Sequence, residues 1–404
     1  MCNLFTHIVV MCHVRKIKLY KKMKQIKLLT LLLLTSIVQL SVAQTKLPVI
    51  RATSKRVDIK EDENLKKGAW IISPETNPDV YVTSAKKVTF HTDISSITFK
   101  INPMVGEYNF IILLNEKDSA RTQIKYQPSR LDMLKKAATY NYKDTRYVPT
   151  FTYQSKDNPN LVRIREELKL DSVAGKGNEV SRILNLMHWV HNIVRHDGNS
   201  TNPTLKNAID LIKVCRTEKR GVNCRMMATI LNECYLSLGL KSRYVTCVPK
   251  ETEFDDCHVI NMVYSNDLQK WIWVDPTFDA YVMNEKGELL GLAEVRERLI
   301  NNKPLILNPE ANWNREESQT KENYLDYYMA KNLYRIQCSV SSEYDTESFK
   351  EGKTVTYLEL LPLDGLVQTP QKSENNDLKS AQRTKNLFVS YKTNNPNLFW
   401  TKPE

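Results

Sequence analysis

The sequence predicts an α+β protein in which a small all-β domain precedes a larger domain of helices and strands. Residues 44–128 contain runs such as "DVYVTSAKKVTFHTDISSITFKI" and "YNFIILL", where apolar and polar residues alternate between turn signals, as in half-buried strands. Helical periodicity begins near residue 129 and is clearest in "NEVSRILNLMHWVHNIVRHDG", whose apolar stripe we expect to run to Gly198. After residue 240, the runs "SRYVTCV", "HVINMVY" and "KWIWVDPTF" are rich in β-branched and aromatic residues and indicate strands again.

The beginning of the chain has the features of a secretory signal peptide. From Met23 it reads "MKQIKLLTLLLLTSIVQLSVAQT", with a basic start, an apolar run and a small-residue cleavage site after Ala43. The apolar run is too short to span a bilayer comfortably. Residues 1–22 fit no part of this pattern, so we expect translation to begin at Met23. The sequence therefore predicts a protein that is exported to the periplasm or the extracellular space and has no transmembrane helix after cleavage.

Most of the positive charge also lies in this leader. The chain has 58 Lys and Arg against 46 Asp and Glu, a formal net charge of +12. Residues 1–43 hold seven of the basic residues and none of the acidic ones, which leaves 51 against 46, or +5. A charge this small removes the main support for nucleic-acid binding.

The segment "GVNCRMMATILNECYLSLGL" places Cys224 at the start of an amphipathic helix. Asn223 is a good N-cap, and the unpaired N–H groups and dipole at a helix start, with the charge of Arg225, favour a thiolate. Cys224 also lies on the apolar face of this helix, so a packing role is the alternative. Cys234, in mid-helix, is expected in the core.

A base and an orienting group for this thiol follow on two strands. A nucleophilic cysteine needs a base, and the base needs a partner that orients it. His258 begins "HVINMVY", and Asp275 ends the strand in "KWIWVDPTF". If the hairpin turn is centred near Asp267 or Leu268, Asp275 lies diagonally across from His258 on the same face, with about 7 to 8 Å between backbones.

The three segments resemble the core of the transglutaminase-like superfamily, which shares a papain-like Cys-His-Asp arrangement with cysteine proteases and peptide-N-glycanases. The resemblance covers roughly residues 180–290 and rests on "GVNCRMMATILNECYLSLGLKSRYV", "HVINMVY" and "KWIWVDPTF". It implies a transglutaminase-like, papain-like core in which the nucleophile helix packs on an antiparallel sheet. By this resemblance Cys224 is the nucleophile, His258 the general base and acid, and Asp275 the residue that orients the imidazole.

The resemblance also implies a reaction, and the patterns along the chain predict an order of domains. The reaction is acyl transfer through a thioester acyl-enzyme, and hydrolysis of amide bonds in a peptide, protein or glycopeptide is the favoured form. We expect the signal peptide at 1–43, the β-domain at 44–128, the catalytic core at 129–300, and a C-terminal extension at 301–404 packed on the core. This extension should combine a helix at "KENYLDYYMAKNLY", strands at "TVTYLELLPL" and "NLFVSYK", and a polar loop near "QKSENNDLKSAQRTKN".

The chain departs from the family pattern in two places. Family members often carry Trp two residues after the histidine, where this chain has Ile260, and animal transglutaminases resemble Gly-Gln-Cys-Trp where this chain reads "VNCR". The second departure disfavours cross-linking. No calcium-loop signature is present. The N–H of Cys224 would be one oxyanion donor, and candidates for a second donor are Asn207, Asn223 and Tyr235.

Other functions stay open at this point. The same fold could serve as a protein-glutamine transglutaminase with an amine acceptor, or as a catalytically silent module that binds peptide or glycan. Burial of Cys224, or a disulfide to Cys215, would favour the silent module. Cys247 and Cys257 flank a loop that could bring them within disulfide range. His188 and His191 lie beside the helical stripe without nearby acidic or cysteine ligands, so we expect neither a metal nor a cofactor.

Overall fold

The computed structural model describes residues 46–251, 253, 256–364, 366–376 and 385–404. The chain divides into two compact units between Gln127 and Pro128. The expected signal peptide at 1–43 lies outside the described residues. Within those residues, no helix combines the length and the apolar character needed to cross a membrane.

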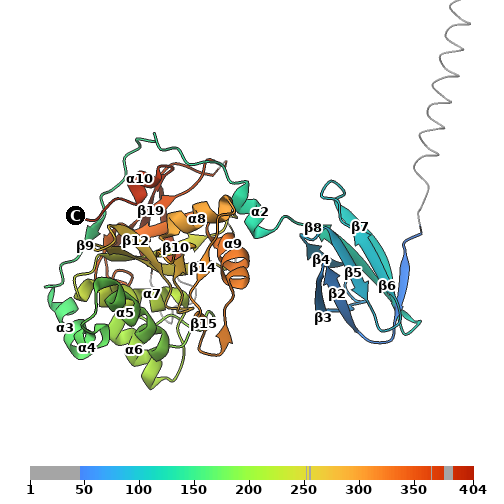
Figure 1. The fold of residues 1–404 in the computed structure, drawn as a ribbon, viewed down its shortest axis with the longest axis horizontal. Helices are drawn as coiled ribbons and strands as arrows, with labels where there is room; N and C mark the ends of the chain where they lie inside the picture. Colours follow the sequence, from blue (N-terminus) through green and yellow to red (C-terminus); the bar gives the residue numbers. More distant parts are fainter. Residues whose placement is uncertain (1–45, 252, 254–255, 365, 377–384) are drawn as a thin grey trace, which may run out of the picture. The chain divides into compact units, whose positions relative to one another are not determined.

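The N-terminal unit is a pair of four-stranded sheets that share one apolar core (Figure 1). The strand order is β1-β7-β8-β4 in one sheet and β3-β2-β5-β6 in the other. Phe90 of one sheet and Phe110 of the other meet with ring centroids 5.0 Å apart. The strands are β1 (Val49–Ala52), β2 (Arg56–Glu61), β3 (Asn64–Ile71), β4 (Asp79–Thr83), β5 (Lys87–His91), β6 (Ser96–Lys100), β7 (Glu107–Leu114) and β8 (Asp118–Tyr126).

The second unit is built on a seven-stranded sheet with the order β12-β11-β10-β17-β19-β21-β20. Three of its strands, β10 (Ser242–Val248), β11 (His258–Ser265) and β12 (Lys270–Val274), coincide with the runs that the sequence predicted. The other four come from the C-terminal quarter of the chain, which thus extends the same sheet: β17 (Arg335–Ser339), β19 (Thr354–Leu360), β20 (Gln371–Asn376) and β21 (Lys385–Thr393).

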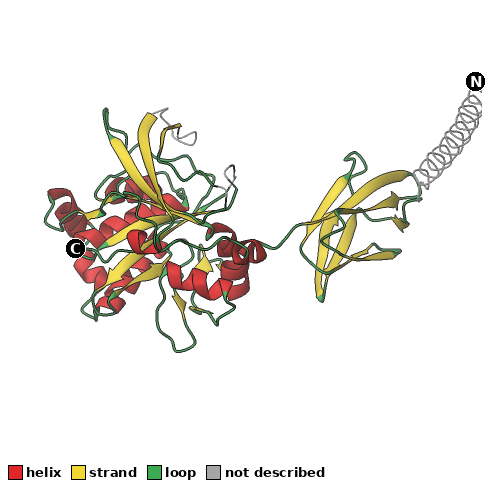
Figure 2. Ribbon diagram, turned by 90° about the horizontal axis from the view of Figure 1, so that it is seen from above, coloured by secondary structure: helices red, strands yellow, loops and turns green. Residues whose placement is uncertain are grey.

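Helices pack on both faces of this sheet (Figure 2). Helix α7 (Cys224–Ser237) contacts β10 and β11, and its apolar side chains share a core with Val263, Ile272 and Val274. The alternate residues Ile260, Met262 and Trp273 point into a second core on the other face. The helices that accompany α7 are α3 (Pro159–Glu167), α4 (Leu170–Ala174), α5 (Glu179–Ile193) and α6 (Ala208–Thr217).

The second core is closed by shorter helical segments. Helix α8 contacts β12, and α9 contacts β10. A π-helical segment, η1, precedes α9, and Tyr324 and Leu325 of η1 are buried in this core. The segments are α2 (Arg130–Lys135), α8 (Leu292–Ile300), η1 (Glu322–Met329), α9 (Ala330–Asn332) and α10 (Pro396–Phe399).

Short bridging strands complete the unit. They form three two-stranded pairs, one of them between β9 and β18. Their bounds are β9 (Thr152–Tyr153), β13 (Val282–Met283), β14 (Ile306–Leu307), β15 (Asn312–Trp313), β16 (Glu317–Ser318) and β18 (Ser341–Ser342).

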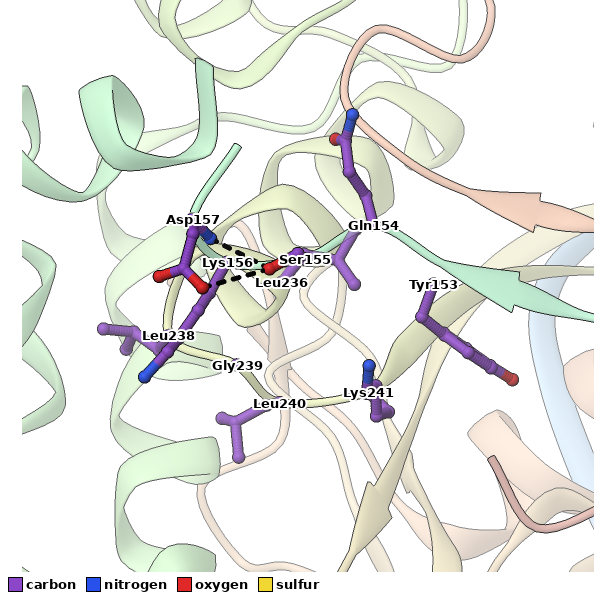
Figure 3. A pocket seen from close by; sticks show the side chains of 10 residues that line it. All are labelled: Tyr153, Gln154, Ser155, Lys156, Asp157, Leu236, Leu238, Gly239, Leu240 and Lys241. Carbon is purple, nitrogen blue, oxygen red and sulfur yellow. Dashed lines mark hydrogen bonds between the residues drawn. The ribbon is translucent and has the colours of Figure 1, made fainter. Parts of the chain in front are cut away.

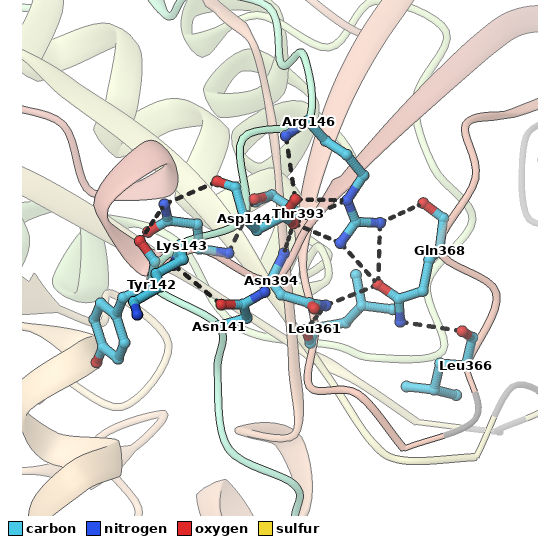
Figure 4. Close-up of polar contacts among 11 residues, drawn as sticks. Asn141, Tyr142, Lys143, Asp144, Arg146, Leu361, Leu366, Gln368, Thr393 and Asn394 are labelled. Carbon is cyan, nitrogen blue, oxygen red and sulfur yellow. Dashed lines mark hydrogen bonds and ion pairs between the residues drawn. The ribbon is translucent and has the colours of Figure 1, made fainter.

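Polar contacts tie the segment after α2 to the C-terminal strands (Figure 4). Arg146 pairs with Asp144 at 2.8 Å and donates to the carbonyl of Gln368 at 2.9 Å. Asp144 also accepts from the backbone N–H of Asn394 at 3.1 Å. These bonds anchor the irregular chain that precedes the helical layer.

Two boundaries differ from the sequence expectations. The stripe predicted to continue to Gly198 ends as a helix at Ile193, because Val194 already has extended backbone angles. Residues Gln371–Asn376, expected in a polar loop, form β20 and pair with β21. Charged and polar residues suit an edge strand, where only one side is paired. Residues 377–384 of that expected loop lie outside the described residues.

Candidate active site

Cys224 stands at the N-terminus of α7, as the sequence predicted. The side chain of Asn223 caps the helix by accepting from the backbone N–H of Met226 at 3.1 Å. Cys224 is partly exposed, and its thiol is free. Cys224 therefore forms no disulfide with Cys215, and although it packs against Ala228, Tyr244 and Val259 it is not fully buried.

The hairpin of β11 and β12 has the predicted register. Met262 pairs with Trp273 and Ser265 with Lys270, which centres the turn between Asp267 and Leu268. Asp275 is thereby diagonal to His258, and its Oδ2 lies 2.6 Å from Nε2 of His258. This bond leaves Nδ1 of His258 available to the thiol, and the hydroxyl of Tyr328 lies 3.4 Å from the same nitrogen.

The pKa values of this pair favour an ion pair. Burial alone would raise the pKa of the Cys224 thiol, but hydrogen bonding by His196 and His258 and the positive charge of His258 lower it to about 6. Burial opposes the charge on His258, yet the carboxylate of Asp275 and the hydrogen bond to it raise the pKa of His258 to about 10. Both shifts favour a thiolate on Cys224 beside an imidazolium on His258.

The other described cysteines contrast with Cys224. Burial raises the pKa of Cys257, the second partly exposed thiol, to about 11, and raises the pKa of Cys338 to the same range. Burial also raises the pKa values of Cys215, Cys234 and Cys247. The disulfide considered between Cys247 and Cys257 is wrong, because both thiols are free.

Asp275 is held by a buried set of donors. Tyr324 Oη donates to its Oδ2 at 2.6 Å, and the backbone N–H of Thr277 donates to its Oδ1 at 2.9 Å. Trp273 Nε1 in turn donates to Tyr324 Oη at 3.1 Å. Because Tyr324 lies in η1, outside the expected core at 129–300, local sequence patterns gave no sign of its role.

Arg225 does not supply the positive charge that the sequence suggested. Its guanidinium donates to Glu347 Oε1 at 2.6 Å and to Thr246 Oγ1 at 2.8 Å. Glu347 also accepts from the hydroxyl of Tyr244 at 2.9 Å. The charge of Arg225 is thus balanced by Glu347, and the histidines stabilise the thiolate instead.

His196 helps to lower the pKa of the Cys224 thiol and was missed by the sequence analysis. Its Nδ1 accepts from Trp313 Nε1 at 3.1 Å, and its backbone forms a bridge with Val222, two residues before Cys224. It was assigned to a helix that in fact ends three residues earlier, at Ile193.

His188 and His191 support the loop after Asp275. His188 Nδ1 lies 2.6 Å from Asp279 Oδ1, and this hydrogen bond raises the pKa of His188. His191 Nδ1 lies 3.0 Å from the carbonyl of Pro276. Both histidines therefore position the loop, and this accounts for their spacing.

A hollow of about 730 Å³ lies between α6 and residues 197–205. Asn202, one of its lining residues, accepts from Asn223 Nδ2 at 2.7 Å. A smaller hollow of about 380 Å³ lies at the C-terminal end of α7, between residues 153–157 and 236–241 (Figure 3). The first is the candidate substrate surface, because Asn202 links its lining to Asn223, the residue before Cys224. It is lined by Asp197, Ser200, Thr201, Asn202, Pro203, Thr204, Leu205, Asp210, Lys213, Val214, Thr217, Glu218 and Arg220.

Comparison with known proteins confirms the family resemblance over the core. Residues 166–276 match the model of the transglutaminase-like superfamily, a range that includes Cys224, His258 and Asp275. No curated protein matches the chain.

Two solved structures illustrate the similarity. One is a candidate cysteine protease from Cytophaga hutchinsonii, 24% identical, with 29% of this chain and 37% of that one covered and a TM-score of 0.24. The other is a transglutaminase from red sea bream, 13% identical, with 62% and 52% covered and a TM-score of 0.23. The chain thus spans between a third and just over half of their lengths.

Proposed function

Given a transglutaminase-like core at residues 166–276, we propose that the protein is a cysteine-dependent acyl-transfer enzyme that hydrolyses amide bonds. The observation that carries the proposal is the free, partly exposed Cys224 thiol, whose pKa is lowered to about 6 beside a histidine bound to a buried aspartate. Such a cysteine is a nucleophile at neutral pH.

The steps follow from this geometry. The Cys224 thiolate attacks the carbonyl carbon of an amide and forms a tetrahedral intermediate. His258, protonated and oriented by Asp275, gives its proton to the leaving amine, and a thioester on Cys224 remains. His258 then accepts a proton from water, which attacks the thioester, and the acid is released as the thiolate is restored.

A peptide, protein or glycopeptide is the proposed substrate. The hollow beside α6 contains acidic residues, Asp210 and Glu218, and basic residues, Lys213 and Arg220, among small polar ones. A lining of both charges and of hydrogen-bonding groups suits the alternating donors and acceptors of a peptide backbone. Hydrolysis is preferred to cross-linking because "VNCR" at the nucleophile departs from the animal transglutaminase pattern.

We also propose that the enzyme acts outside the cytoplasm after removal of residues 1–43. N-terminal sequencing of the protein recovered from the periplasm or the medium should begin at Gln44. Recovery of uncleaved chain from the cytoplasm alone would refute export.

The test of activity combines labelling and turnover. Residues 44–404 are treated with iodoacetamide at pH 6.5, and the alkylated cysteines are mapped by mass spectrometry. Cys224 should react first, with Cys257 as the internal comparison because it is partly exposed but has a raised pKa. A peptide-amide library is then screened for hydrolysis and, with a primary amine added, for amine incorporation. Equal labelling of both thiols with no turnover would favour the silent binding module.

A further inference from the structure

His196 is a second histidine beside the nucleophile, and a hydrogen bond from Trp313 fixes its tautomer. Trp313 Nε1 donates to His196 Nδ1 at 3.1 Å, with the two rings edge to face. An indole N–H can only donate, so Nδ1 must present its lone pair, and the neutral imidazole carries its proton on Nε2. Nε2–H is then the group left to face Cys224, and His196 helps to lower the pKa of that thiol.

The backbone of His196 is held from two sides. A parallel bridge joins it to Val222, where the N–H of Val222 donates to the carbonyl of Arg195 at 3.0 Å. On the other side, the N–H of His196 donates to Asn314 Oδ1 at 2.7 Å, and Asn314 Nδ2 donates to the carbonyl of His196 at 3.0 Å. The imidazole is thus fixed relative to the start of α7 before any substrate binds.

The residues proposed from sequence as the second oxyanion donor have other partners. The side-chain oxygens of Asn207 and Asn223 accept from the backbones of α6 and α7, and their amide groups donate to Asp210 and Asn202. Tyr235 is buried and donates to the carbonyl of Ile183 at 2.9 Å. These three expectations are therefore not supported by the geometry.

We propose that His196 Nε2–H is the second oxyanion donor of this enzyme, with Trp313 as the positioning residue that keeps the proton on Nε2. This inference rests on the proposed acyl transfer at Cys224. Attack forms the S–C bond, and the electron pair of the carbonyl π bond moves to oxygen. The backbone N–H of Cys224 and the Nε2–H of His196 then both donate to that oxyanion. When the intermediate collapses, the pair returns to the carbonyl, and the proton on Nε2 never leaves His196.

Two reactions of one thiolate separate this role from thiolate stabilisation. Iodoacetamide alkylation forms no oxyanion, whereas acylation by p-nitrophenyl acetate does, and p-nitrophenolate leaves without needing a proton. Both rates scale with the thiolate fraction. The ratio of the acylation rate to the alkylation rate at one pH therefore reports the oxyanion donors. Alkylation of the same variant also shows that its thiol is intact and accessible. The substitutions are made in residues 44–404 and compared with the unaltered chain.

His196→Ala should lower the acylation-to-alkylation ratio about 100-fold or more, the usual effect of losing one oxyanion donor. His196→Gln places an amide N–H near the position of Nε2 and should restore at least ~10-fold of that loss, whereas His196→Asn places its donor near Nδ1 and should not. Trp313→Phe keeps a ring but frees the tautomer, so the ratio should fall several-fold.

The outcomes separate the two proposals. If His196→Ala keeps the ratio within about threefold of the unaltered chain, or if His196→Gln is no better than His196→Ala, the donor assignment is wrong. An unchanged ratio in Trp313→Phe would overturn the control of the tautomer. If the unaltered chain forms no thioester on Cys224 at all, the proposed function itself fails, and this result does not depend on any His196 variant.

Discussion

Removal of the His258 imidazole should change the pH profile of Cys224 alkylation more than its rate at pH 7. In the intact site, burial is outweighed by His196 and His258, and the pKa of Cys224 is lowered to about 6 from an ordinary value of 9.0. In His258→Ala only His196 remains, so the alkylation midpoint should rise to roughly pH 8 to 9. The thiolate fraction at pH 7 then falls from about 0.9 to between about 0.1 and 0.01.

Intrinsic reactivity offsets much of this loss. A more basic thiolate is a better nucleophile. With a Brønsted slope of about 0.4, the lower end of the usual range, a rise of two to three units in the pKa of Cys224 speeds the thiolate roughly 6- to 16-fold. The net rate at pH 7 should therefore fall only about two- to sixfold. At pH 9.5, where most of the thiol is ionised in the variant too, it should label roughly six- to twelvefold faster than the unaltered chain. The two profiles should cross.

The assay is quantitative mass spectrometry of iodoacetamide-labelled Cys224 from pH 5 to 10, scaled to Cys257 in the same sample. Cys257 serves as the reference because burial raises its pKa to about 11. A variant whose Cys224 still titrates near pH 6, with no crossing, would refute the claim that His258 holds the thiolate.

Three further perturbations test other parts of the site. Asp275→Asn keeps an acceptor for His258 but removes the charge that raises the pKa of His258 to about 10. The alkaline limb of the pH profile of acylation should therefore move to a lower pH by at least about one unit. An alkaline limb that stays in place would contradict this. Tyr324→Phe leaves the buried Asp275 without one donor and should lower the free energy of unfolding by about 1.5–3 kcal/mol in urea titrations, and a loss under ~0.5 kcal/mol would mean that the bond adds little. His188→Gln tests linkage. Because Asp279 raises the pKa of His188 in the folded state, its ion pair adds stability below the unfolded value of 6.5 that is lost as pH rises through the folded value. The variant should thus be less stable than the unaltered chain at pH 6 by at most about 1 kcal/mol, since the ring is over a third exposed, and the gap should close by pH 9. A gap that does not change with pH would exclude the ion pair as its source.

Local patterns predicted the central elements of the site because each depends on neighbouring residues. Alternation set β11 and β12, the cap at Asn223 set the start of α7, and the two-residue period of a strand made the diagonal of His258 and Asp275 follow from the turn alone. The contribution of the C-terminal strands to the same sheet could not be read this way. Their pairing with β10 depends on contacts between residues about 90 positions apart, for which the sequence carries no periodic signal.

The same reasoning explains why Arg225 misled and His196 was overlooked. Helix periodicity assigns Arg225 a place near the thiol, but its charge is balanced by Glu347, more than 100 residues away. His196, which helps to lower the pKa of Cys224, lies outside helix α5, after its end at Ile193. Burial of Val194 in the helical core is compatible with a helix or with the extended backbone that it adopts, so the apolar stripe alone did not show where α5 ends.

Gly221 is the one residue near the nucleophile whose identity reflects the approach of the segment that carries His196. A Cβ atom at this position would lie 2.6 Å from the carbonyl oxygen of Arg195 and 2.9 Å from Cβ of Asp197, closer than side chains tolerate. Only glycine therefore allows the strand-like bridge between His196 and Val222 to form at this distance. The start of α7 directs backbone N–H groups along the helix axis toward the thiolate. Because Gly221, three residues before Cys224, has no side chain, His196 can approach from the side as the proposed second N–H donor. The spacing of glycine and cysteine in "GVNC" is accordingly a requirement of the site as a whole: a residue larger than glycine would separate His196 from Cys224 without altering either side chain.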